Sequence, residues 1–186
     1  MSRRQQALDA AIRVLGTHGA RRLTHRAVDA EAGLPAGSAS NYFRTREALV
    51  EAVLGRLIAL EQQAWAEVAT DLGESGPIDA DAFAAALGEL LRDLTGRRRV
   101  ITLARLAVFV EAAVQPVLRT GISDVRADLE KQGTEWLRRL GSRDPVHDLW
   151  GLMALLDGQL INQCTTPDPA FDPEPAIRTF LRGIVR

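Results

Sequence analysis

Apolar residues recur at helical spacing in almost every segment of this chain, and each segment ends at a glycine or a proline. In the first, Leu8, Ala11, Ile12 and Leu15 follow the i, i+3, i+4, i+7 spacing of one buried helix face, and Gly19 is a natural stop beyond it. Ala and Leu dominate the apolar residues, whereas aromatic residues make up only 5% of the chain. The pattern predicts an all-α protein of about nine to ten helices.

Capping residues and helix breakers set the expected helix ends. Thr24 and Thr45 are suitable N-caps, Gly33 is a suitable C-terminal stop, and Pro35 is suited to the first turn of a short third helix. We expect the other helices at about residues 4–18, 24–33, 45–72, 79–94, 100–114, 117–140, 147–164 and 177–184.

Charge is distributed unevenly although the formal net charge is only −1. Residues 1–47 carry eight arginines against four acidic residues, a net +4, and the remainder carries 15 basic and 20 acidic residues. A basic head on an acidic body indicates that one end contacts phosphate groups.

Several classes of protein are disfavoured. The chain has no run of about 18 apolar residues, which a membrane span would need, and its N-terminal residues lack the apolar run of a secretory signal. Cys164 is the only cysteine, so no disulfide can form within the chain. The chain also lacks His/Cys metal-ligand spacing, a G-x-S-x-G elbow and a phosphate-binding loop. We therefore expect a cytoplasmic protein that is not an enzyme and has no metal or cofactor.

The segment from Leu23 to Leu49 is the most informative part of the chain. A short helix, a tight turn at Gly33 and a second short helix are the parts of a helix-turn-helix. The second helix must be thin and polar on its outer side to enter a major groove about 12 Å wide, and residues 37–41 (Gly-Ser-Ala-Ser-Asn) meet that requirement. A merely solvated polar face is the alternative interpretation.

This segment resembles the TetR family of bacterial regulators. The family's helix start, turn, aromatic pair and fourth-helix start correspond here to Thr24, Ala32-Gly33, Gly37-Ser38, Tyr42-Phe43, Thr45, Arg46-Glu47 and Leu49. The resemblance implies a helix-turn-helix DNA-binding domain over residues 1–48, joined through a long helix to a ligand-binding and dimerisation domain over residues 49–186. It also implies a repressor that is released from a palindromic operator by a small molecule.

The DNA-contacting residues are carried over from that resemblance. Candidates for the groove or the phosphates are Thr24, His25, Arg26, Gly37, Ser38, Ser40, Asn41, Tyr42, Arg44 and Arg46. Three positions depart from the family pattern: Ser40 stands where a groove-facing Tyr is frequent, Arg46 replaces a Lys, and Asp29 replaces a small apolar residue. We expect Asp29 either to pair with a nearby Arg or to cap a neighbouring turn.

The resemblance assigns the rest of the chain to ligand binding and dimerisation. Helices at about 117–140 and 147–164 are expected to form a four-helix bundle in a homodimer. Residues that are candidates to line an apolar pocket with a few polar groups are Trp65, Arg105, Phe109, Glu111, Trp136, Trp150, Gln159 and Asn162. Core packing is the alternative for the tryptophans, and hydrogen bonding across the dimer is the alternative for Gln159 and Asn162.

Two other functions stay open at this point. The first is a DNA-binding regulator whose body senses no small molecule and which acts through a partner protein or as an activator. The second is a helical binding or enzymatic protein whose N-terminal motif is incidental. An apolar body without an accessible cavity favours the first, and a neutral or acidic surface on the short polar helix favours the second. The +4 head argues against the second.

Overall fold

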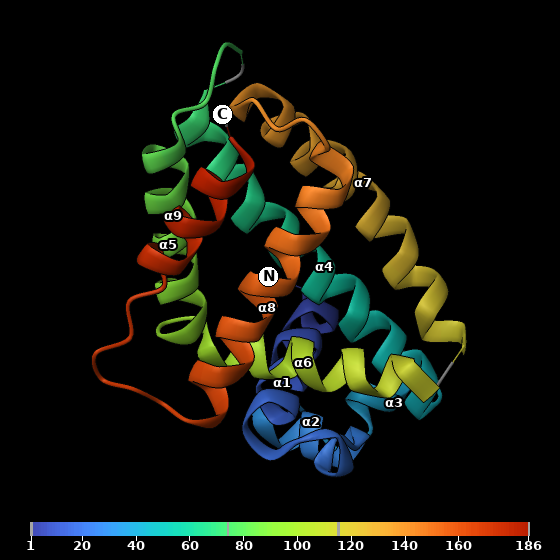
Figure 1. Cartoon of the computed structure of the whole chain (residues 1–186). Helices are drawn as coiled ribbons and strands as arrows, with labels where there is room; N and C mark the ends of the chain where they lie inside the picture. Colours follow the sequence, from blue (N-terminus) through green and yellow to red (C-terminus); the bar gives the residue numbers. More distant parts are fainter. Residues whose placement is uncertain (1, 74, 115, 186) are drawn as a thin grey trace. The chain divides into compact units, whose positions relative to one another are not determined.

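The computed structural model describes residues 2–73, 75–114 and 116–185 and contains only helices in that part of the chain (Figure 1). They are α1 (Arg3–His18), the 3₁₀-helix η1 (Ala20–Arg22), α2 (His25–Ala32), α3 (Ser38–Tyr42), α4 (Arg46–Leu72), α5 (Ala80–Thr95), α6 (Arg99–Val114), α7 (Pro116–Leu140), α8 (Pro145–Thr165) and α9 (Glu174–Ile184). The predicted all-α fold is confirmed, and most predicted helix ends agree to within a few residues.

Side-chain caps explain several of these ends. The Asp79 carboxylate accepts a hydrogen bond from the Ala82 N–H at 2.8 Å at the start of α5, and Asp144 caps α8 through the His147 N–H. Gly19 ends α1 with a φ of 77°, a conformation that few side chains tolerate. Gly19 therefore stops α1 as predicted, and α5 starts directly after Asp79, where the predicted helix of residues 79–94 begins.

The chain forms two compact units, each assembled from two separate stretches. The first unit contains Met1–Glu61 and Arg98–Val125, and the second contains Gln62–Arg97 and Arg126–Arg186. Because α4 and α7 run through these boundaries, each contributes residues to both units.

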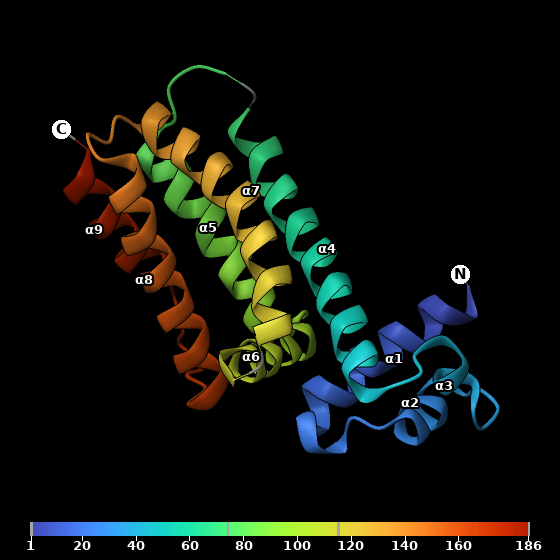
Figure 2. The same ribbon diagram turned by 90° about the vertical axis from the view of Figure 1, so that its right-hand side faces the viewer.

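The first unit is built around α1, which packs against both α2 and α6. Its core is formed by apolar side chains including Leu15, Leu23, Val28, Leu49 and Val53. The helices α1, α2 and α3 gather beside the beginning of α4 (Figure 2). Each of α2 and α3 therefore packs one face on this core and leaves the other face exposed.

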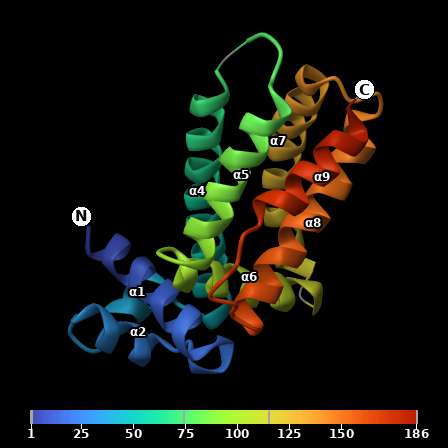
Figure 3. The ribbon, with the colours of Figure 1, turned by 60° about the vertical axis from the view of Figure 1, so that its left-hand side comes forward.

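The second unit packs α5, α8 and α9 side by side (Figure 3). Its core contains Phe83, Leu137, Ile177 and Leu181, all 1% exposed or less. The Trp136 ring lies 5.9 Å from the Trp65 ring and 6.0 Å from the Phe83 ring, between centroids. These aromatic contacts join the ends of α4, α5 and α7 within this unit.

The predicted position of Pro35 is wrong. Pro35 lies outside α3, in the turn before it, and its carbonyl accepts hydrogen bonds from the Ser38 N–H at 3.1 Å and the Ser38 hydroxyl at 2.6 Å. The chain needs a left-handed residue before α3, and Gly37 supplies it with a φ of 89°. The proline, whose φ is fixed near −65°, is therefore placed in the turn that leads to the helix.

Candidate nucleic-acid interface

Helix α2 begins and ends at the residues that the sequence indicates. The Thr24 hydroxyl oxygen accepts a hydrogen bond from the Ala27 N–H at 3.2 Å, and Gly33 ends the helix in the left-handed conformation with a φ of 62°. The Thr24 oxygen is therefore already used as an acceptor by the helix backbone. Thr24 can still donate its hydroxyl proton to a phosphate.

Asp29 connects α2 to α3. Its side chain is only 4% exposed, and its two carboxylate oxygens accept hydrogen bonds from the Gly37 N–H at 2.8 Å and the Ala39 N–H at 2.7 Å. Of the two roles expected for Asp29, the structure shows the cap of a neighbouring turn. The carboxylate thereby satisfies two amide groups at the start of α3.

Helix α3 presents a small polar surface. Ala39 and Phe43 are buried beneath it, whereas Ser40, Asn41 and Tyr42 are exposed. The Ser38 hydroxyl donates to the Pro35 carbonyl, and the Ser40 hydroxyl donates to the Gly37 carbonyl at 2.8 Å. The candidate groove-facing residues thus lie together on one short helix, with their hydroxyl protons directed to the backbone.

Basic side chains accompany this surface. Arg26 on α2 and Arg44 just after α3 are exposed. His25 is half-buried, and its Nε2 atom is buried with no hydrogen-bond partner among the residues described here. These three candidates lie on the two helices of the motif or next to them, where phosphate contacts would hold the motif on a duplex.

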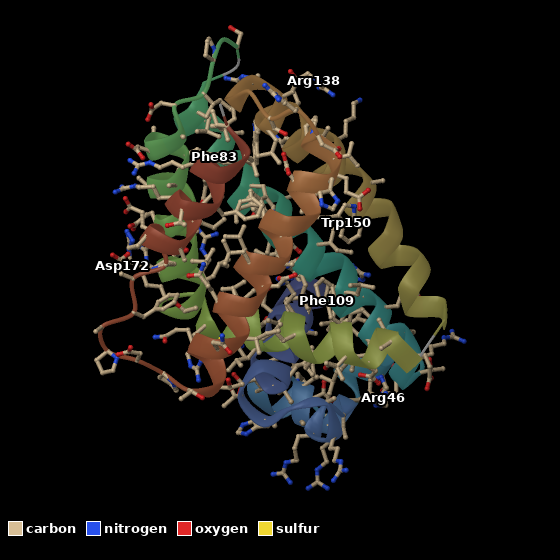
Figure 4. All side chains as sticks on the ribbon, in the orientation of Figure 1. Arg46, Phe83, Phe109, Arg138, Trp150 and Asp172 are labelled. Carbon is tan, nitrogen blue, oxygen red and sulfur yellow. The ribbon has the colours of Figure 1, made fainter. Side chains whose placement is uncertain are left out.

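Arg46 differs from the other basic candidates because it has a charged partner. Its Nη1 donates to the Glu111 Oε1 at 2.7 Å, and its Nη2 donates to the Ala20 carbonyl at 3.4 Å. Arg46 lies at the start of α4 (Figure 4). It keeps 41% of its side chain exposed, whereas Glu111 on α6 keeps 12%. The guanidinium at the start of α4 is therefore partly exposed to solvent and partly held by a largely buried carboxylate.

The start of α4 also carries a local cap. The Thr45 oxygen accepts a hydrogen bond from the Ala48 N–H at 3.1 Å, as predicted. The pKa of Glu47 is lowered, first by a hydrogen bond from its own backbone N–H and then by one from the Thr45 hydroxyl and by the charge of Arg46. A carboxylate in the first turn is also favoured by the helix dipole.

The candidate ligand-binding residues are divided between the two units. In the first unit, the Arg105 guanidinium lies 4.8 Å from the Phe109 ring centroid and its Nη1 lies 3.8 Å from Glu61 Oε1. In the second unit, Trp65 packs on Trp136, whereas Gln159 is half-buried and Asn162 is exposed on α8. The structure thus brings Arg105 and Phe109 together.

Two sequence profiles match the chain. The profile described as "Bacterial regulatory proteins, tetR family" matches residues 7–53, and the profile described as "Tetracyclin repressor-like, C-terminal domain" matches residues 78–186. The chain belongs to the TetR family of bacterial transcriptional regulators. TetR-family regulators are non-enzymatic DNA-binding proteins, which confirms the prediction that the chain is not an enzyme.

Solved structures agree with this assignment. A TetR-family member from Streptomyces coelicolor is 27% identical with a TM-score of 0.75, covering 100% of this chain and 99% of its own. The multidrug binding protein EbrR complexed with imidazole is 29% identical with a TM-score of 0.68, covering 100% and 96%. EbrR complexed with ethidium is 27% identical with a TM-score of 0.71, covering 100% and 99%. No curated protein sequence matches the chain.

Two features of this TetR-family chain lay beyond sequence reasoning. The sequence indicates Glu111 only as a pocket residue, because no local pattern pairs it with Arg46, 65 positions earlier. The hydrogen bonds of the Ser38 and Ser40 hydroxyls could not be predicted either, because the carbonyls that accept them become neighbours only once the turn has formed.

Within the described residues, no helix has the length and apolar character needed to cross a membrane.

Proposed function

We propose that this TetR-family regulator is a cytoplasmic repressor that binds a palindromic operator as a homodimer and is released by a small ligand. Residues 1–48 act as the DNA-binding domain, and residues 49–186 bind the ligand and form the dimer. The observation that carries the proposal is the surface of α3, where small polar residues lie outward over a buried Ala39 and next to the exposed Arg44. A duplex can approach such a helix closely.

The dimer is proposed to form through α7 and α8. Val146, Trp150 and Ile161 are 58%, 49% and 44% exposed, and their spacing places them on one face of α8. A hollow of about 510 Å³ adjoins Val146 and Trp150 and is also lined by Lys131 and Arg138 of α7. Figure 4 labels Trp150 and Arg138. An apolar face with a polar rim supports a two-fold interface with a second copy of this chain.

Two matched substitutions test the dimer. Val146→Asp places a charge on the proposed interface, whereas Val110→Asp makes the same change at a 73% exposed valine on α6. We expect light scattering after gel filtration to give a dimer for the wild type and for Val110→Asp, and a monomer for Val146→Asp. A dimer in all three proteins would rule out this face.

A planar, nitrogen-containing aromatic compound is the proposed class of ligand. The support is that EbrR, a structural relative at 27–29% identity, has been solved with imidazole and with ethidium. Of the candidate residues, we propose that Trp65, Gln159 and Asn162, all in the second unit, take part. For Arg105 and Phe109 of the first unit, ligand binding stays a prediction. The Gln159 Nε2 is buried with no hydrogen-bond partner within the described residues, which supports a polar contact there.

Ligand entry requires a rearrangement of the second unit. Its aromatic cluster surrounds a cavity of only about 10 Å³, lined by residues including Trp65, Phe83, Trp136 and Met153. Such a volume holds about one water molecule. A ligand of drug size would therefore bind only a state in which these side chains have moved, and differential affinity for that state would shift the regulator away from DNA.

Fluorescence anisotropy tests the proposed function directly. The probe is the duplex immediately upstream of this protein's coding region, with a scrambled duplex as control. We expect a preference of ~10³-fold or more for the upstream duplex that weakens as salt rises, and release when imidazole, which does not intercalate into DNA, is added. Equal weak binding to both duplexes contradicts operator recognition at that site. Specific binding that no ligand changes would favour a regulator that senses no small molecule.

A further inference from the structure

The five-residue helix α3 has no cap of its own. Gly37, at its N-cap position, has no side chain, and the helix is too short to be stable without external contacts. The Asp29 carboxylate, supplied by α2, takes the place of that cap by accepting hydrogen bonds from the Gly37 and Ala39 amides at 2.8 and 2.7 Å. Both oxygens are used, each by a different amide.

This arrangement fixes α3 in rotation as well as in position. The two amides flank Ser38, and the Ala39 side chain between Ser38 and Ser40 is fully buried. Because two amides that are two residues apart both donate to this one carboxylate, α3 has little freedom to turn about its axis. The outward direction of Ser40 and Asn41 follows from that restraint.

The same carboxylate changes the electrostatics of the helix start. It satisfies two of the amides that a DNA phosphate would otherwise bind and places a negative charge against the positive end of the helix. Contacts of α3 with DNA must therefore come from its side chains. Asp29 opposes non-specific phosphate binding while it orients the groups that read bases.

We infer that Asp29 is a positioning residue for operator recognition, whose buried carboxylate sets the orientation of α3. The inference rests on the proposed function, because it requires that α3 reads DNA. For removal of the Asp29 charge, the inference predicts the opposite effect on DNA affinity from the one that electrostatic repulsion alone would predict. Removal of a negative charge near DNA strengthens binding by electrostatics alone, whereas removal of this carboxylate weakens sequence-specific binding.

The test compares Asp29→Asn with Glu31→Gln. Both remove one negative charge from α2, but Glu31 is exposed and pairs with Arg13 at 2.7 Å, away from the amides of α3. The probe is the duplex that the wild type enriches from a randomised duplex library, and the control is a scrambled duplex of the same composition. Val14→Ala, which removes buried methyl groups from α1, controls for loss of stability.

We expect Asp29→Asn to lose tenfold or more in affinity for the enriched duplex while binding the scrambled duplex as well as the wild type does, or better. We expect Glu31→Gln and Val14→Ala to keep the wild-type ratio of the two affinities. If Asp29→Asn keeps that ratio within twofold, the inference is wrong and the proposed function stands. If the wild type enriches no duplex, the proposed function itself fails.

A second measurement uses the wild type and does not depend on a variant that folds. Hydrogen exchange resolved at single amides reports whether Gly37 and Ala39 are held in the protein without DNA. We expect both amides to exchange at least tenfold more slowly than the same backbone amides would in an unstructured peptide. Exchange at the rate of an unstructured peptide would overturn the inference, because the carboxylate would then not be restraining α3.

Discussion

Replacement of Gly16 by alanine should separate two helices of the first unit. A Cβ built on Gly16 of α1 would lie 2.0 Å from the Val100 carbonyl oxygen of α6 and 2.9 Å from its carbonyl carbon. An ordinary carbon–oxygen contact is about 3.3 Å or longer, so α1 and α6 would have to move apart by about 1.3 Å. Because the obstacle is backbone, no change of rotamer relieves it.

Two opposing effects set the magnitude. Alanine is favoured over glycine by at most about 1 kcal/mol in a helix, and by less in the last turn of α1, where Gly16 lies. Overpacking of a core costs about 1–3 kcal/mol or more, and a gap of 0.5–1 Å along the rest of the contact loses about a quarter to a half of its dispersion energy. The clash therefore outweighs the gain, and we expect a net loss of about 2 kcal/mol.

Gly55→Ala is the matched control. Gly55 lies in the interior of α4, and no described atom beyond its own neighbours and helix backbone comes within 4 Å of an added Cβ. The same chemical change should stabilise the chain there by about 0.5–1 kcal/mol. Thermal unfolding followed by circular dichroism should show a midpoint about 4–8 °C lower for Gly16→Ala and about 1–4 °C higher for Gly55→Ala.

Hydrogen exchange locates the effect of Gly16→Ala. All three tryptophans lie in the second unit, so their fluorescence does not report on α1. We expect faster exchange in peptides from α1 and α6 and unchanged exchange in α9. If Gly16→Ala is as stable as Gly55→Ala, the close approach of α1 and α6 does not exist in solution.

Three further substitutions test single contacts. Glu111→Gln removes the carboxylate that holds Arg46 and should raise affinity for an enriched duplex about fivefold, about 1 kcal/mol, in an anisotropy titration; unchanged affinity would mean that the pair does not compete with DNA. Asp79→Ala removes the cap of α5 and should cost about 1 kcal/mol in urea unfolding, with Asp79→Asn nearly neutral. Because the pKa of Glu47 is lowered in the folded state, its contribution is complete above the ordinary glutamate pKa and is lost as pH falls through the lower folded value. Glu47→Gln should therefore flatten acid unfolding in that pH range, and an unchanged acid transition would contradict the hydrogen bonds with the Glu47 backbone and Thr45.

Local signals were sufficient for the helices and their ends. Helical spacing of apolar residues, with Thr24 and Thr45 as caps, predicted elements that the structure contains, because a cap and the helix it starts are only a few residues apart. Pro35 was misplaced for a local reason as well. A proline fits a first helical turn, but the left-handed Gly37 needed before α3 determined where that helix starts.

Contacts between distant residues could not be read in the same way. The first unit joins residues 1–61 with residues 98–125, and no periodicity within either stretch indicates the other. The pairing of Arg46 with Glu111 and the approach of Gly16 to Val100 both depend on that assembly. The division of function at residue 48 stays a prediction, since the compact units follow packing and not function.

The hydrogen bonds of α3 change what its surface offers to DNA. From the sequence, Ser38 and Ser40 are potential donors, but in the structure each hydroxyl proton is directed to a carbonyl of the preceding turn. Each hydroxyl then presents lone pairs outward, which suit the amino groups of adenine and cytosine in the major groove. Donation to a phosphate or to guanine requires the bond to the carbonyl to break, at a cost of about 1 kcal/mol each. The donors that this surface offers to DNA are therefore the exposed Asn41 amide and Arg44 guanidinium. Substitutions there should alter sequence preference or salt dependence more than substitutions at either serine.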